Sequence, residues 1–88
     1  MEGVERADFE KRLKHDVETM LGFDTASMKF TDRLATALTA VRCFRLRIAK
    51  CDEHFRWHMF ETIGERTGFT REQVAGMFSH IHGKGSDD

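Results

Sequence analysis

Apolar residues in this chain recur every three or four positions, and no segment alternates polar and apolar residues as a β-strand does. Positions three and four apart share one face of an α-helix, so the spacing predicts amphipathic helices. The sequence also contains no proline, the residue that most strongly interrupts a helix. We therefore expect an all-α fold.

The positions of apolar residues and of helix-ending residues divide the chain into four expected helices. Gly22 can end the first helix in a left-handed conformation, and Thr31 or Asp32 can cap the second. With 88 residues there is room for one domain, so we expect residues 1–88 to form a single small bundle. The expected helices cover about residues 4–21, 32–50, 53–67 and 70–82, followed by a disordered tail over residues 83–88.

The boundary between the second and third helices is open in the sequence. Asp52 can cap a new helix, but Phe55, Met59 and Ile63 continue the apolar stripe of the preceding segment almost in phase. A single helix over residues 32–67 is therefore an alternative. One short chain could not cover so long a helix, so this alternative would favour a dimer.

Residues 60–79 resemble the helix-turn-helix motif of DNA-binding regulators. That motif has a small residue where its two helices cross and a glycine in the turn, as Gly64 and Gly68 would provide. An apolar residue and a capping residue follow, and then apolar residues three apart enter the core. Phe69, Thr70, Val74 and Met77 occupy these positions. Thr70 and Gln73 also fit a capping box at the start of the second helix. The resemblance is to a structural motif and names no family.

The resemblance implies that the last helix reads DNA in the major groove. Arg71 would bond guanine, Gln73 would bond adenine, and Thr70 would hold a phosphate at the helix N-terminus. Ser79 would face the groove further along. Residues 31–60 carry six basic and three acidic residues, so the phosphate contacts are expected there and nearby. The expected phosphate clamps are Arg42, Arg45, Arg47 and Arg66.

A protein-interaction module without DNA binding is the alternative function. The whole chain has a formal net charge of −1, and Glu72 in the expected recognition helix would repel phosphate. Two capped helices joined by such a turn also occur in domains that do not touch DNA. A tryptophan beside an arginine is typical of protein contacts, so this alternative places an interface at Trp57, Phe60 and Met28. A homodimer is expected under either function, because small chains gain stability by associating.

Other chemistry has weaker support in the sequence. Cys51, His54 and His58 share one face of a helix and carry zinc-binding atoms, but their spacing matches no standard zinc module, so we expect no metal. No nucleophile, base and orienting group form a recognisable set, so we expect neither an enzyme nor a cofactor. No apolar run approaches the roughly 20 residues of a membrane span, and a cytoplasmic regulator of transcription is the favoured interpretation.

Overall fold

A computed structural model describes the backbone of residues 2–86 and the side chains of residues 3–83. Within this range the chain forms four helices and no strand: α1 (Glu2–Met20), α2 (Phe30–Ala49), α3 (Glu53–Thr67) and α4 (Arg71–Ser86). The expected all-α class is confirmed. None of these helices is long and apolar enough to cross a membrane.

The helices α2 and α3 are separate, so the alternative of one helix over residues 32–67 is wrong. Asp52 accepts a hydrogen bond of 2.8 Å from the Phe55 backbone N–H and caps the start of α3. The guanidinium of Arg56 donates to the carbonyl oxygens of Ala49 and Cys51 at 3.2 and 2.9 Å. These bonds satisfy polar groups on both sides of the break, and a continuous helix could not make them.

The end of α4 differs from the expected one. We expected a stop near Gly83 and a disordered tail over residues 83–88, but the helix continues through Gly83 to Ser86. Among the described residues only Gly68 has a positive φ, and Gly83 stays helical. A glycine inside a helix costs about 1 kcal/mol relative to alanine without ending it. Residues 87–88 lie outside the described part of the chain.

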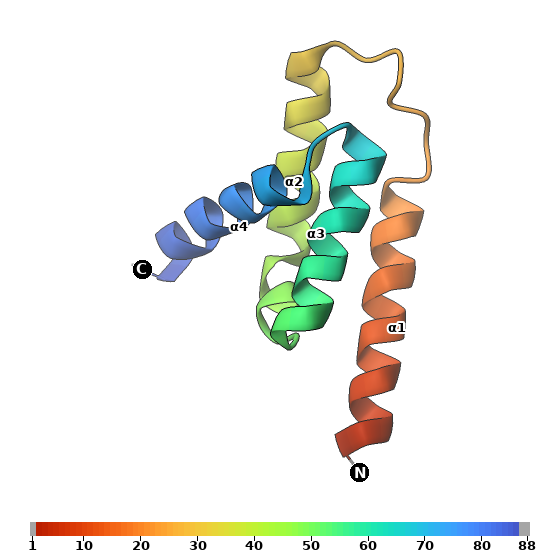
Figure 1. Cartoon of the computed structure of the whole chain (residues 1–88), viewed down its shortest axis with the longest axis vertical. Coiled ribbons are helices and arrows are strands. Elements are labelled where there is room, and N and C mark those ends of the chain that lie inside the picture. Colours follow the sequence, from red (N-terminus) through yellow and green to blue (C-terminus); the bar gives the residue numbers. More distant parts are fainter. Residues whose placement is uncertain (1, 87–88) are drawn as a thin grey trace.

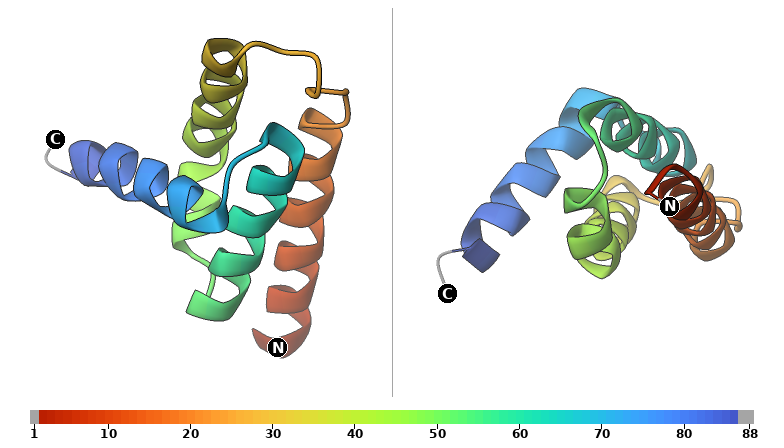
Figure 2. Two further views of the ribbon diagram at one scale, coloured as in Figure 1. Left: turned by 45° about the horizontal axis from the view of Figure 1, so that its top comes forward. Right: turned by 90° about the horizontal axis from the view of Figure 1, so that it is seen from below.

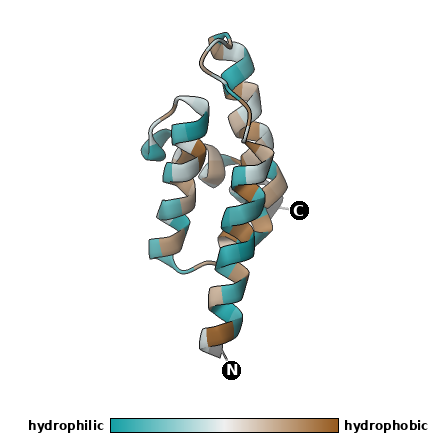
Figure 3. Cartoon of the chain, turned by 90° about the vertical axis from the view of Figure 1, so that its right-hand side faces the viewer, coloured by the Kyte–Doolittle hydropathy of each residue, from teal (hydrophilic) through white to brown (hydrophobic). Residues whose placement is uncertain are grey.

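The first three helices lie side by side, and α4 leaves them at a steep angle (Figures 1 and 2). Going along the chain, α1 and α3 run in one direction and α2 in the other (Figure 1). The last helix packs on α2 and α3 through residues from Val74 to Ile81, and its C-terminal end extends away from the body (Figure 2). The solvent-facing side of α1 is largely hydrophilic (Figure 3).

One hydrophobic core joins all four helices. Each helix contributes side chains that are almost completely buried, as the three-and-four spacing predicts. These are Leu13 and Val17 from α1, Ala37, Ala40, Val41, Phe44 and Ile48 from α2, Met59, Phe60 and Ile63 from α3, and Val74 and Phe78 from α4, with Leu21 just after α1.

Two glycines shape the turn between α3 and α4. Gly64 lies so close to the turn that precedes α4 that an added Cβ would overlap the Phe69 carbonyl oxygen. Gly68 has a φ of 86°, a left-handed conformation that favours glycine, and its N–H donates to the Gly64 carbonyl oxygen at 2.8 Å. The Phe69 N–H donates to the same oxygen at 2.9 Å. The crossing of α3 and α4 therefore depends on the absence of a side chain at position 64.

Gly64→Ala should destabilise the fold, whereas Gly76→Ala should not. The new methyl group at position 64 forces the backbone of the turn to move, which should lower the free energy of unfolding by about 2–3 kcal/mol. Nothing lies within 4 Å of a Cβ at Gly76 in the middle of α4, so alanine there should raise it by about 0.5–1 kcal/mol. Urea unfolding followed by circular dichroism measures both variants, and equal effects would contradict the close crossing.

Candidate nucleic-acid interface

The outer face of α4 is open to solvent along its described length. Val74 and Phe78 point into the core, and the opposite side of the helix is free because the helix projects from the body (Figure 2). Within residues 71–83, the exposed positions are Arg71, Glu72, Gln73, Gly76, Ser79, His80 and Gly83. Gly76, Ser79 and Gly83 are small, so another molecule can approach the helix backbone closely at these three positions.

The capping box expected at the start of α4 is present. The Gln73 side-chain oxygen accepts from the Thr70 N–H at 2.9 Å, and the Thr70 hydroxyl accepts from the Gln73 N–H at 3.1 Å. The side chain of Gln73 is therefore turned back toward the backbone. Reading adenine needs both its amide oxygen and its amide nitrogen, so Gln73 is occupied in this arrangement.

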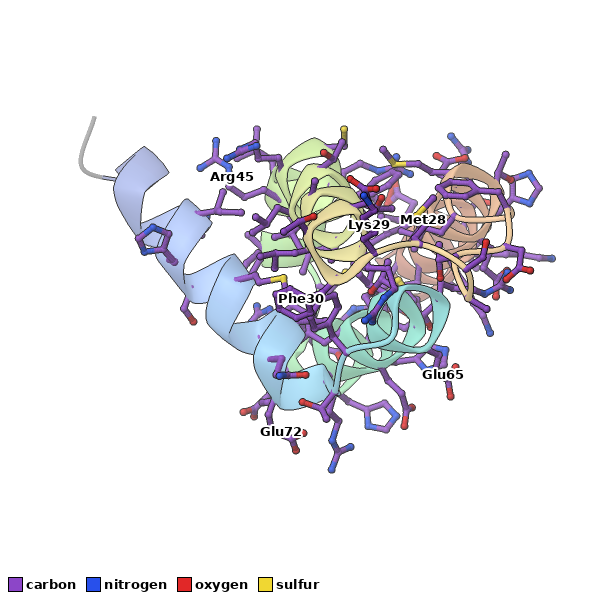
Figure 4. The ribbon with its side chains drawn as sticks, turned by 90° about the horizontal axis from the view of Figure 1, so that it is seen from above. Met28, Lys29, Phe30, Arg45, Glu65 and Glu72 are labelled. Atoms are coloured by element: carbon purple, nitrogen blue, oxygen red, sulfur yellow. The ribbon has the colours of Figure 1, made fainter. Side chains whose placement is uncertain are left out.

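Arg71 is held against the body of the protein. Its guanidinium carbon lies 5.7 Å from the centre of the Trp57 ring, and its Nε lies 3.3 Å from a carboxylate oxygen of Glu72. Glu72 points away from the body (Figure 4). These groups surround an open hollow of about 550 Å³ that Glu53 and His54 also line. Two carboxylates beside one guanidinium leave this end of α4 without an excess of positive charge.

The four expected phosphate clamps do not form one cluster. Arg47 pairs with Asp16 at 2.9 Å and lies over the Phe44 ring, so it joins α2 to α1. Arg66 is exposed near the end of α3 and lines a different hollow, beside the loop after α1. Arg45 extends from α2 on the side where the outer half of α4 lies (Figure 4), and the exposed Arg42 is one turn before it.

The expected protein interface is corrected at Phe60. That side chain is 2% exposed and packs between the rings of Trp57 and Phe78, at centroid distances of 5.4 and 5.3 Å. It is a core residue, because its position on α3 faces α4. Trp57 is half-buried at the edge of this aromatic row, and Met28 is half-buried in the loop before α2. The structure therefore does not bring the three residues together at one surface.

The three metal candidates also have separate surroundings. The Cys51 thiol is buried and donates to the Arg47 carbonyl oxygen at 3.4 Å. Burial, and secondarily the charge of Glu10, raises the pKa of this thiol. His54 is exposed, and the ring of His58 packs against Phe55 at 5.6 Å. Among the described side chains, no three His, Cys, Asp or Glu residues are placed to hold a metal ion.

Sequence reasoning missed Arg33, which supports the turn between α3 and α4. Its Nη1 donates to the Thr67 carbonyl oxygen at 3.3 Å. The same guanidinium lies 5.8 Å from the centre of the Phe30 ring and 5.7 Å from that of the Phe69 ring. Arg33 therefore connects α2 to the C-terminus of α3. Its positive charge also interacts favourably with the negative end of the α3 helix dipole.

Thr25 adds a second support at the same end of α3. Its hydroxyl donates to the Arg66 carbonyl oxygen at 2.7 Å, and the residue is 8% exposed. In the sequence, the spacing of three between Phe30 and Arg33 could have indicated that these two side chains are in contact. It could not have indicated the contacts of Arg33 and Thr25 with α3. Both contacts to α3 join residues more than 30 positions apart, which periodicity cannot reveal.

No protein-family model, curated protein or solved structure matches this chain. Its own geometry therefore provides the basis for a functional proposal.

Arg33→Met should lower the free energy of unfolding by about 1–2 kcal/mol. The variant keeps an apolar stem between the two phenylalanines but loses the charge and the hydrogen bond at the end of α3. Arg12→Met is the matched control, because Arg12 forms only an exposed ion pair with Asp8 and should change stability by less than about 0.5 kcal/mol. Urea unfolding of the two variants tests this, and equal losses would show that Arg33 does not support the turn.

Proposed function

We propose that this chain is a small DNA-binding regulator that places the outer face of α4 in the major groove. The observation that carries the proposal is the projection of α4 from the body, at a crossing that Gly64 and Gly68 hold tightly. A recognition helix must stand clear of its supporting helices in this way to enter a groove about 12 Å wide.

The middle and outer part of α4 is the proposed reading surface. Gly76 and Ser79 add little bulk, so the helix backbone can come close to the base edges. Ser79 and His80 are exposed there and carry groups that hydrogen-bond to bases. Gln73 is assigned to capping, and Thr70 holds the helix N-terminus at which a phosphate can bind.

The phosphate contacts are proposed at Arg45, which extends from α2 on the side of the outer half of α4 (Figure 4), and at the exposed Arg42 one turn before it. Arg71 can join them once it leaves Trp57 and Glu72. Glu53 and Glu72 oppose phosphate at the other end of the recognition helix, so few contacts are expected there. This charge arrangement predicts a shallow dependence of affinity on salt, since the slope follows the number of phosphates neutralised.

A protein partner is the second candidate function, and the hollow between α3 and α4 favours it. The half-buried Trp57 and Arg71 lie together there, a pair of residue types enriched at the centres of protein interfaces. Under this proposal the flanking Glu53 and Glu72 would face basic groups of the partner.

Ser79→Glu should weaken DNA binding by about tenfold or more, which corresponds to ~1.4 kcal/mol. A carboxylate on the outer face of α4 would be repelled by phosphates and by acceptor groups on base edges. Thr19→Glu is the matched control, because it makes the same charge change at an exposed position of α1. Fluorescence anisotropy with a labelled random duplex at low salt measures the affinities. Absence of binding by the unaltered protein, or equal losses in both variants, would refute the DNA proposal.

The fluorescence of Trp57, the only tryptophan of the chain, gives a second measurement of DNA binding. If Arg71 leaves the indole to contact a phosphate, the emission of Trp57 should change as DNA is added, and Arg71→Ala should abolish that change. DNA binding with constant emission in the unaltered protein would remove Arg71 from the interface. Trp57→Ala removes the ring that holds Arg71, so it should not weaken DNA binding, whereas it should weaken a protein complex formed at the hollow.

A further inference from the structure

The side of α2 that faces away from α3 carries a line of exposed residues. Leu46, at 61% exposed, is the most exposed large apolar residue of this helix after its first turn. Ala35 lies 11 positions earlier, close to three helical turns, so the two residues share one line along the helix. Neither α1 nor α4 covers this side of α2 (Figure 2). The exposed residues on it are Asp32, Ala35, Thr39, Arg42, Cys43, Leu46 and Lys50.

A mainly apolar hollow opens beside the first half of this line. It has a volume of about 260 Å³ and lies where the end of α1 meets α2. Phe23, at 48% exposed, forms part of its wall. The residues around the hollow are Met20, Leu21, Phe23, Ala35, Thr36 and Thr39. Short side chains on α2 leave room for a branched apolar group.

The charges at the two ends of the line have opposite signs. Asp32 lies in the first turn of α2, and Lys50 follows its last turn. Val41 lies midway in the sequence between Asp32 and Lys50, and also midway between Thr36 and Leu46. A single two-fold axis at this midpoint would therefore place Leu46 against the hollow and Lys50 beside Asp32 at the same time.

We propose that this face of α2 binds a second copy of the chain in an antiparallel arrangement. Leu46 of each copy enters the hollow at Ala35, Thr36 and Thr39 of the other, and Asp32 pairs with Lys50 across the interface. Such a contact is self-complementary, as a two-fold dimer requires. The two Arg42 side chains come near each other at the rim, and their long stems let the charged groups move apart into solvent. This interface does not involve the outer face of α4. Arg42 at its rim is also a proposed phosphate contact, so Leu46, Asp32 and Lys50 are the interface residues that have no part in the proposed DNA binding.

Replacement of Leu46 tests the apolar half of the contact. Leu46→Asp should raise the dimer dissociation constant by about tenfold or more, because a charge would replace the buried side chain. Val4→Asp is the control, because Val4 is similarly exposed, at 65%, but lies on α1. Sedimentation equilibrium of the full chain measures association, and circular dichroism verifies that each variant is folded. A monomeric unaltered protein, or a Leu46→Asp variant that dimerises normally, would overturn the proposal.

A charge exchange tests the pairing and its direction. Asp32→Lys alone and Lys50→Asp alone each place like charges together in a homodimer, so each variant should associate more weakly than the unaltered chain. An equal mixture of the two variants restores both pairs, and a heterodimer should form. Failure of the mixture to associate would exclude the antiparallel register.

Cys43 gives an independent measure of proximity. It lies beside the proposed midpoint and is exposed, whereas Cys51 is buried. A short bifunctional maleimide should therefore join two chains through Cys43, and the product should be lost in Leu46→Asp. Equal cross-linking of both proteins would show random collision and contradict the interface.

Discussion

The carbonyl groups at the C-terminus of α3 must be satisfied in a crowded part of the molecule, and this requirement organises the fold. A helix leaves its last four carbonyl groups without partners inside the helix. Here Thr25 donates to one of them from the loop and Arg33 donates to another from α2. The Gly68 and Phe69 N–H groups share the carbonyl oxygen of Gly64. The loop after α1 and the start of α2 therefore meet the end of α3, more than 30 positions away in sequence, and the direction in which α4 leaves follows from their positions.

Local sequence signals predicted the four helices, but not all of their ends. Neither Thr31 nor Asp32 caps α2, which begins at Phe30 after Lys29, and Gly22 does not have a positive φ. The Thr70–Gln73 capping box and the Asp52 cap depend on neighbours three positions away, and both are present. The end of α4 was wrong for a related reason. Gly83 ends a helix only if its backbone turns left-handed, and the sequence does not reveal whether it does. The contacts of Arg33 and Thr25 depend on tertiary structure and have no local pattern.

The candidate site could be predicted less well than the fold. The sequence shows which interactions a side chain can make, but not which of the competing interactions it makes in the folded protein. Gln73 cannot cap α4 and read a base with the same oxygen, and the cap is formed. The position of Arg71 next to Trp57 depends on the angle between α3 and α4, which becomes known only with the fold. The sequence allowed Phe60 to be either an interface residue or a core residue. In the structure Phe78 of α4 packs against it, so Phe60 lies in the core. The exposed residues of α4 around Ser79 are small and take part in neither the cap nor the core. The proposed reading surface therefore lies around Ser79 and not in the first turn of α4, where the sequence had placed it.

The helix α2 has to serve two surfaces, and the size of the chain explains why. A domain of this size buries only about 60–65% of the surface that its unfolded chain exposes, so a small core leaves apolar groups outside. The inner side of α2 is fully used by Val41 and Ile48, which are completely buried. Its outer side retains an exposed leucine in the second half of the helix, an apolar hollow beside the first half, and opposite charges at its two ends. Burying that leucine in a second copy would extend the apolar core without changing α4. A two-fold pair would also carry two projecting helices, the arrangement with which regulators contact two half-sites on one duplex. Dimer formation through α2 would then stabilise the fold without covering the face of α4 that is proposed to read DNA.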